Sequence, residues 1–157
     1  MNGSDTIVRE PRTRRSPAER TGGERLEAAY APRRASAAEM RSALRSLLAK
    51  QSLDTATASQ IVLAVDEAFI NAVVHAGGGD APIRVSACVR ENEASIEVRD
   101  GGGGFTYRRP ARRSVPDVGG TCGRGVFLME SMMDEVSVRT GRGGTTVQMV
   151  KRLGRLA

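Results

Sequence analysis

The chain has few aromatic residues, no tryptophan, one histidine and no long apolar run. Aromatic residues make up only 3% of its 157 residues, so aliphatic side chains must supply most of the hydrophobic core. No stretch of about 18 consecutive apolar residues occurs, so no membrane span is expected. The basic N-terminal region lacks the apolar segment of a secretory signal. We therefore expect a soluble cytoplasmic protein.

Cysteine is also scarce, and the basic charge is not arranged for nucleic-acid binding. Cys88 and Cys122 have neither metal-ligand spacing nor a disulfide framework, which fits a reducing compartment. The formal net charge is +6 and the sequence pI is about 10.3. However, the arginines are spread along the chain among acidic residues, and aromatic side chains are too few to stack on bases. Direct nucleic-acid binding is therefore not expected.

The composition divides the chain into a tail and one domain. Residues 1–23 are polar, rich in arginine, interrupted by Pro and Gly, and without apolar periodicity. Such a segment buries too little apolar surface to offset the entropy of ordering, so we predict a disordered basic tail. Residues 24–157 are long enough to form a single domain with its own core.

Hydrophobic periodicity predicts the order β-α-α-β-β-loop-α-β-β for this domain. The first helix should begin at Ser36, with Glu39 completing a capping box, and the second at the N-cap Asp54. Alternating apolar residues predict strands on either side of the turn at 91–93, and again around the turn at 141–144. Residues 106–122 read as a polar loop, followed by a short helix from 125. This order predicts an α+β fold: a two-layer sandwich with a mixed, mostly antiparallel sheet covered on one face by helices.

The second helix carries an unusual polar stripe on an otherwise apolar surface. Glu67, Asn71 and His75 recur at intervals of four residues. A solvated helix face is the plain alternative, but in this chain such a face should carry arginine or lysine. A carboxylate one turn from an amide can act as a base while the amide oxygen holds Mg²⁺. Asp66 lies off the stripe and is interpreted as structural.

Asp100 ends a predicted strand just before four glycines. Side chains alternate along a strand, so Asp100 shares a face with Ile96 and Val98 and should point toward the helices. A carboxylate there is costly unless a donor reaches it. Asp100 either caps the glycine turn locally or accepts a hydrogen bond from the amino group of a ligand.

Two glycines flank Arg124 where the third helix is expected to begin. Backbone N–H groups at Gly123 and Gly125, together with the helix dipole, would form a site for a phosphate. A flexible entry turn explains the same pattern equally well.

Four motifs occur together in a characteristic order. These are EAFIN at 67–71, DGGGG at 100–104 followed by Phe105, GRG at 123–125 and GGTT at 143–146. The set resembles the N, G1 and G2 boxes of the GHKL ATPase superfamily, whose ATP-binding domain has the Bergerat fold. Within that superfamily, NAVVHA and GVFLMESMMDEVSV are similar to the anti-sigma factor serine/threonine kinases. The resemblance covers about residues 24–153.

The resemblance implies an adenine site at the end of the second hairpin strand. Asp100 would accept a hydrogen bond from the adenine amino group, and Thr145 would support that contact. Gly102 and Gly104 would allow the backbone to pass close to the base, where a Cβ would intrude.

The resemblance also implies a phosphate side to the same site. Asn71 would ligate Mg²⁺, and Glu67 would be the catalytic base that orients or deprotonates an attacking hydroxyl. Gly123 and Gly125 would bring N–H groups to the phosphates of ATP, with Arg124 adding positive charge.

The family relation implies a regulator of transcription. Such a protein would be a homodimer that binds Mg-ATP, sequesters a sigma factor and phosphorylates an anti-anti-sigma partner on Ser or Thr. The alternative is a non-catalytic regulator of the same fold, in which bound ATP only gates protein binding.

Overall fold

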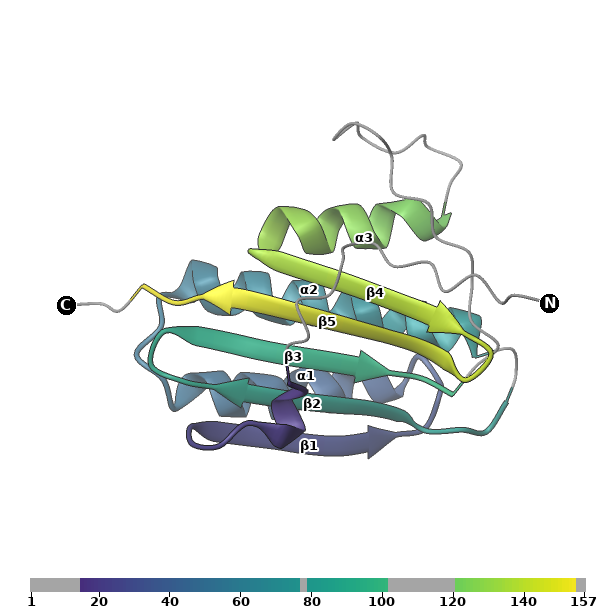
Figure 1. Cartoon of the computed structure of the whole chain (residues 1–157), viewed down its shortest axis with the longest axis horizontal. Coiled ribbons are helices and arrows are strands. Elements are labelled where there is room, and N and C mark those ends of the chain that lie inside the picture. Colours follow the sequence, from purple (N-terminus) through teal and green to yellow (C-terminus); the bar gives the residue numbers. More distant parts are fainter. Residues whose placement is uncertain (1–14, 77–78, 102–120, 155–157) are drawn as a thin grey trace.

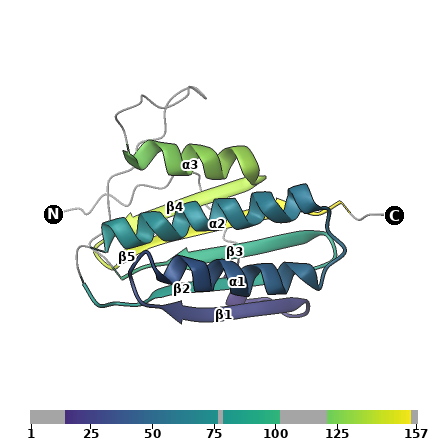
Figure 2. The same ribbon diagram turned by 180° about the vertical axis from the view of Figure 1, so that it is seen from behind.

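A computed structural model describes residues 15–76, 79–101 and 121–154, with the side chains of 121–124 excepted. Three helices cover one face of a five-stranded sheet in the order β1-β2-β3-β5-β4 (Figures 1 and 2). The elements are β1 (Glu24–Tyr30), α1 (Ser36–Ala49), α2 (Thr55–His75), β2 (Ile83–Val89), β3 (Glu93–Arg99), α3 (Thr121–Met132), β4 (Glu135–Gly141) and β5 (Gly144–Arg152). The predicted element order and α+β class are confirmed. Every strand pair described is antiparallel, so the expectation of a mixed sheet is wrong for the described strands.

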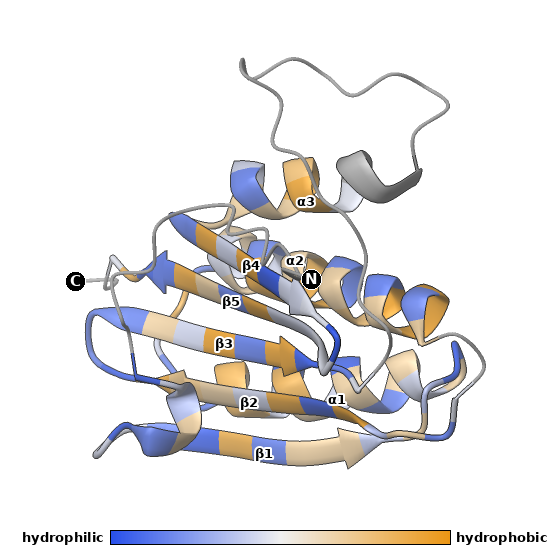
Figure 3. Ribbon diagram, turned by 45° about the vertical axis from the view of Figure 1, so that its right-hand side comes forward, coloured by the Kyte–Doolittle hydropathy of each residue, from blue (hydrophilic) through white to orange (hydrophobic). Residues whose placement is uncertain are grey.

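Alternation along the strands places the core between the sheet and the helices. On β3, Ala94, Ile96 and Val98 are buried, whereas Glu97 and Arg99 face the other side of the sheet. Figure 3 shows the same alternation of hydrophobic and hydrophilic residues along the neighbouring strands. The sheet therefore has one buried face and one open polar face.

α2 is the central helix of the core. Its N-cap Asp54 accepts hydrogen bonds from the Thr57 backbone N–H at 2.8 Å and from the Thr57 hydroxyl at 2.6 Å, as predicted. Phe69 is fully buried, and its ring meets that of Tyr30 edge to face, with centroids 5.7 Å apart. By length and composition alone α2 is long and apolar enough to cross a membrane, a property that helices in a protein core share. Packing of its buried side against the sheet accounts for this apolar character.

Two predicted helix starts differ from the structure. Ser36 does not cap α1: the N-cap is Ala35, no side chain caps the helix, and Ser36 is buried inside it. A preceding turn does the capping instead, because Ser36 N–H and Ala37 N–H donate to the carbonyls of Arg33 and Arg34, each at 3.1 Å. α3 begins four residues before the predicted position, at Thr121.

The predicted tail, residues 1–23, is only partly covered by the structure. Residues 1–14 lie outside the described residues. Residues 15–23, by contrast, lie against the sheet, with a 3-10 helix, η1, at Pro17–Glu19. Arg20 forms an ion pair with Glu93 at the start of β3, and Arg90 Nη2 donates to the Thr21 carbonyl at 2.5 Å. Residues 15–23 therefore belong to the structured part of the chain, although the sequence placed them in the tail before residue 24.

Candidate functional site

Asp100 is a buried carboxylate directly after β3. Only 6% of it is exposed, and it lies on the helical side of the sheet, as strand alternation predicted. Its Oδ1 accepts a hydrogen bond from the Thr145 N–H at 3.2 Å, and its own N–H donates to the Thr145 carbonyl at 3.0 Å. This reciprocal pair fixes the end of β3 to the start of β5, so the carboxylate has a defined position.

A short buried polar chain continues from Asp100 through Thr145. Thr145 is 3% exposed, and its hydroxyl donates to Thr140 Oγ1 on β4 at 3.2 Å. Thr140 was not among the predicted site residues. Alternation with Val136 and Val138 would have placed it on the core face, which was the available signal.

Gly144 is a second residue to which the sequence assigned no role. Its φ is +109°, a region that disfavours any side chain, and an added Cβ would lie 2.1 Å from the Asp100 carbonyl oxygen. The backbone of β5 can approach Asp100 this closely only because residue 144 is glycine. The sequence showed a glycine in a hairpin turn, which does not reveal this contact.

Asn71 of α2 and Asp100 line the same cavity. Its remaining walls are mainly aliphatic side chains from α2, α3 and the sheet, with Thr145 as the other polar member. An apolar pocket with a few fixed polar groups is typical of a small-molecule site. The cavity has a volume of about 10 Å³, which leaves room for about one water molecule at most. Its lining must therefore move to admit a purine ring.

Gly125, in the first part of α3, lies directly against Asn71. A Cβ at this position would be 2.6 Å from Asn71 Nδ2. The structure thus brings together three of the predicted site elements: Asn71 of the polar stripe on α2, Asp100 with Thr145, and the first part of α3. The Asn71 amide, near the N-terminal end of α3, suits a cation that also contacts phosphates. The expectation that the Gly125 N–H is free for a phosphate is wrong, because α3 begins at Thr121 and this N–H lies within the helical hydrogen-bond ladder.

The contact between Gly125 and Asn71 leads to a testable prediction. Gly125→Ala should lower the affinity for Mg-ATP by about tenfold, because the new methyl group displaces the Asn71 amide. Stability should stay equal or rise, since alanine favours a helix by up to about 1 kcal/mol over glycine. Calorimetric titration with Mg-ATP, and with ADP in EDTA as the metal-free control, measures both affinities. An equal loss for both nucleotides would contradict a role through the metal ligand.

Glu67 lies one helical turn before Asn71 and is half-buried, but it does not line the cavity. Burial raises the pKa of its carboxyl above the usual 4.5, and the neighbouring charge of Asp66 raises it further. A raised pKa makes the carboxylate a stronger base near neutral pH. Asp66 itself pairs with Arg41 at 2.8 Å, which agrees with its predicted structural role.

The remaining predicted residues are less fully described. Gly102 and Gly104 lie outside the described residues. Gly123 and Arg124 lie in the first turn of α3. Within the described ranges, no group of three or more His, Cys, Asp or Glu side chains could hold a metal. A Mg²⁺ ion would thus depend on Asn71 and on ligand phosphates, as Mg²⁺ commonly does.

Comparison with known proteins identifies the family that this chain resembles. The model of the histidine kinase-like ATPase domain matches residues 30–151. An anti-sigma F factor of Pasteuria penetrans is 37% identical over 103 residues, covering 60% of this chain and 68% of that protein. The serine-protein kinase RsbW of Bacillus pumilus is 36% identical over 104 residues, covering 59% of this chain and 64% of that protein.

A solved structure supports the same relation at the level of the fold. The RsbU and RsbW domains of a Mycobacterium tuberculosis protein match with a TM-score of 0.67 and 25% identity, covering 88% of this chain and 35% of that chain. The chain spans about two thirds of the length of these two curated relatives. The family match extends over most of the sheet and all three helices. The chain therefore belongs to the family of histidine kinase-like ATPase domains, the GHKL type.

Proposed function

We propose that this protein is a bacterial anti-sigma factor with ATP-dependent serine/threonine kinase activity. The observation that carries the proposal is the buried Asp100 carboxylate, held by Thr145 beside Asn71 and Gly125. The names of the two curated relatives, an anti-sigma F factor and a serine-protein kinase, support this class of function.

The adenine of ATP would bind against Asp100. Its amino group is a donor, and the Asp100 carboxylate is a buried acceptor in a mainly aliphatic cavity, where an unmatched partner is costly. Ala68, Val98 and Met129 would contact the faces of the base once the cavity widens. Gly102 and Gly104 would line the approach, as the family motif implies.

The phosphates would lie toward the start of α3. Asn71 would hold Mg²⁺, which supplies neutralisation of phosphate charge when it is bound. The N–H of Gly123, among the free N–H groups of the first turn of α3, would donate to phosphate oxygens, and Arg124 would add positive charge. Gly125 would contribute by its close approach to Asn71. Glu67 would orient the hydroxyl of a protein Ser or Thr and accept its proton as that oxygen bonds to the γ-phosphorus. The bond from the γ-phosphorus to the β–γ bridging oxygen would break, and ADP would leave.

This activity would serve partner switching in the cytoplasm. The protein, as a homodimer, would sequester a sigma factor and phosphorylate an anti-anti-sigma partner. The second candidate is an ATP-gated binding protein without catalysis, and the half-buried Glu67 with its raised pKa favours the kinase.

Capture from extracts of the native cell, with and without Mg-ATP, tests the proposed partners. We expect a sigma factor in the eluate, and transfer of the labelled γ-phosphate to a small Ser- or Thr-bearing protein. Nucleotide-dependent capture without any labelled partner would instead support the ATP-gated binding protein.

A further inference from the structure

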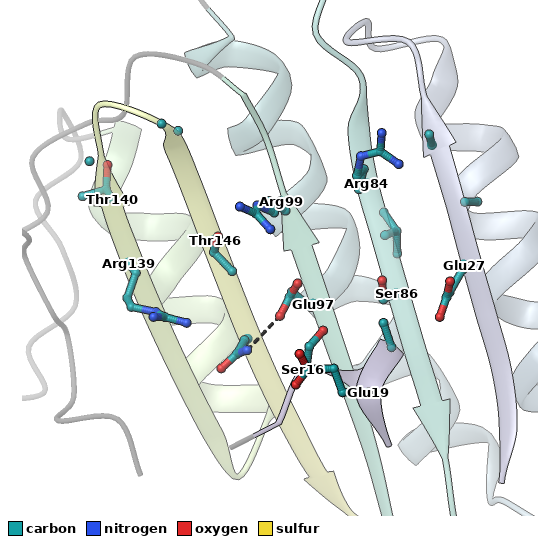
Figure 4. Close-up of a pocket in the computed structure, with 18 residues that line it drawn as sticks. Ser16, Glu19, Glu27, Arg84, Ser86, Glu97, Arg99, Arg139, Thr140 and Thr146 are labelled. Atoms are coloured by element: carbon teal, nitrogen blue, oxygen red, sulfur yellow. Dashed lines mark hydrogen bonds between the residues drawn. The ribbon is translucent and has the colours of Figure 1, made fainter. Parts of the chain in front are cut away.

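We propose that the open face of the sheet is a docking site for an acidic segment of another protein. The site is defined by Arg84 on β2, Arg99 on β3 and Arg139 on β4, here called the arginine row (Figure 4). The proposal concerns the face opposite the helices and does not depend on nucleotide binding.

Strand register places the three arginines in one line across the sheet. Arg84 is directly opposite Arg99, Arg99 is opposite Thr146 of β5, and Thr146 is opposite Arg139. Adjacent strands are about 4.8 Å apart, so the line from β2 to β4 spans about 14 Å at the backbone. The arginines are thus presented to a single ligand rather than scattered over the surface.

The arginine row is unfavourable for the isolated fold. All three residues are exposed, and across the described part of the chain none has a side-chain hydrogen bond or ion pair. Arg84 and Arg99 lie directly opposite one another on β2 and β3. Like charges in this position destabilise the pairing of two strands. Because the row does not stabilise the fold, we infer that it serves binding.

The row lies in a broad surface hollow. The hollow has a volume of about 900 Å³, and its neutral polar members include Ser16, Ser86 and Gln148. Three acidic residues, Glu19, Glu27 and Glu97, also line the hollow, and none of them forms an ion pair with the arginine row. Glu97 instead accepts a hydrogen bond from Gln148 Nε2 at 2.7 Å (Figure 4). The guanidinium groups therefore remain available to carboxylates, which they bind in bidentate geometry.

Other parts of this chain do not match the row in charge. Residues 102–120 contain four arginines and one aspartate, and residues 1–14 contain three arginines and two acidic residues. Both segments are net basic, and a symmetric pairing of this face with the same face of a second copy would bring like charges together. Charge complementarity therefore favours a different molecule with negative charge as the occupant.

An acidic protein segment fits the hollow better than a nucleic acid does. Glu27 and Glu97 occupy the next row, two residues along each strand and about 7 Å away, where they would repel a continuous phosphate backbone. The hollow's lining residues include no aromatic side chain on which a base could stack. A peptide can place carboxylates on the arginines and neutral or basic groups beside the glutamates.

A binding assay with charge-matched variants tests the proposal. The probe is a fluorescein-labelled ten-residue peptide in which glutamate alternates with serine, followed by anisotropy with the full chain. R84Q/R139Q should bind it at least about tenfold more weakly than the wild type, which corresponds to about 1.4 kcal/mol. R34Q/R45Q removes the same charge before and within α1 and should stay within about twofold of the wild type.

The unfolding temperature of R84Q/R139Q distinguishes a role of the arginine row in binding from a role in folding stability. Because R84Q removes one of two opposed charges, the double variant should unfold at the same temperature as the wild type or higher. The proposal fails if both double variants lose binding equally, or if the wild type does not bind the peptide. It also fails if single-stranded DNA of equal charge competes for the row more tightly, or if R84Q/R139Q dissociates a dimer in sedimentation.

Discussion

Glu67→Gln should lower phosphate transfer to the protein partner by roughly 10²–10⁴-fold while ATP still binds, because glutamine keeps the shape of the side chain but cannot accept a proton. Glu67 does not line the cavity that holds Asp100, so the substitution leaves the proposed adenine contacts in place. Transfer of labelled γ-phosphate and calorimetry of Mg-ATP binding, on the same preparations, measure the two effects.

The pH dependence of transfer provides a second readout for Glu67. Transfer by the wild type should rise with pH as Glu67 ionises, with a midpoint above 4.5 because burial and Asp66 raise its pKa. The residual activity of Glu67→Gln should lack this step. Asp66→Asn is the matched control, because it removes a neighbouring charge and should move the midpoint to lower pH without abolishing transfer.

The raised pKa of Glu67 also determines the direction in which Glu67→Gln should change the stability of the fold. A carboxyl whose folded pKa lies above its unfolded pKa contributes stability below the unfolded value, and this contribution is lost as pH rises through the folded value. At pH 7 the variant should therefore be at least as stable as the wild type. Equal transfer by wild type and variant would remove Glu67 from the mechanism.

Gly144→Ala should both destabilise the fold and remove nucleotide binding. A side chain at φ +109° is strained by about 1–2 kcal/mol, and the new Cβ would lie 2.1 Å from the Asp100 carbonyl oxygen. Separation of β5 from Asp100 would also break the reciprocal hydrogen bonds with Thr145. We expect a loss of at least about 2 kcal/mol, or roughly 4–8 °C in the unfolding temperature.

Gly143 provides the control for this substitution. It precedes Gly144 in the same turn, its φ is not positive, and a Cβ there would meet nothing within 4 Å. Gly143→Ala should therefore match the wild type in thermal unfolding and in Mg-ATP affinity. If the two alanine variants behave alike, the close approach at Gly144 is not what positions Asp100.

The features that sequence predicted best are those governed by periodicity. Alternation placed Asp100 on the helical face because Ile96 and Val98 must face the core, and it is buried there. Helical spacing predicted the stripe of Glu67 and Asn71, because side chains four residues apart lie on the same face of a helix. These predictions depend on short-range geometry, which the order of residues determines directly.

Features that depend on contacts distant in sequence could not be predicted. The need for glycine at 144 arises from the backbone of Asp100, forty-four residues earlier, and the arginine row arises from the register of four strands. The failed capping box at Ser36 has a different cause, since the preceding turn already satisfies the helix N–H groups.

The central claim is that Asp100 recognises the amino group of adenine, and calorimetry with two nucleotides tests it most directly. Wild type and Asp100→Asn are each titrated with Mg-ATP and with inosine triphosphate, in which oxygen replaces that amino group. The asparagine oxygen can still accept the Thr145 N–H, so the variant should remain folded. We predict that the wild type prefers ATP by at least about tenfold and that the variant loses both ATP affinity and this preference. Unchanged ATP affinity in Asp100→Asn would contradict the account.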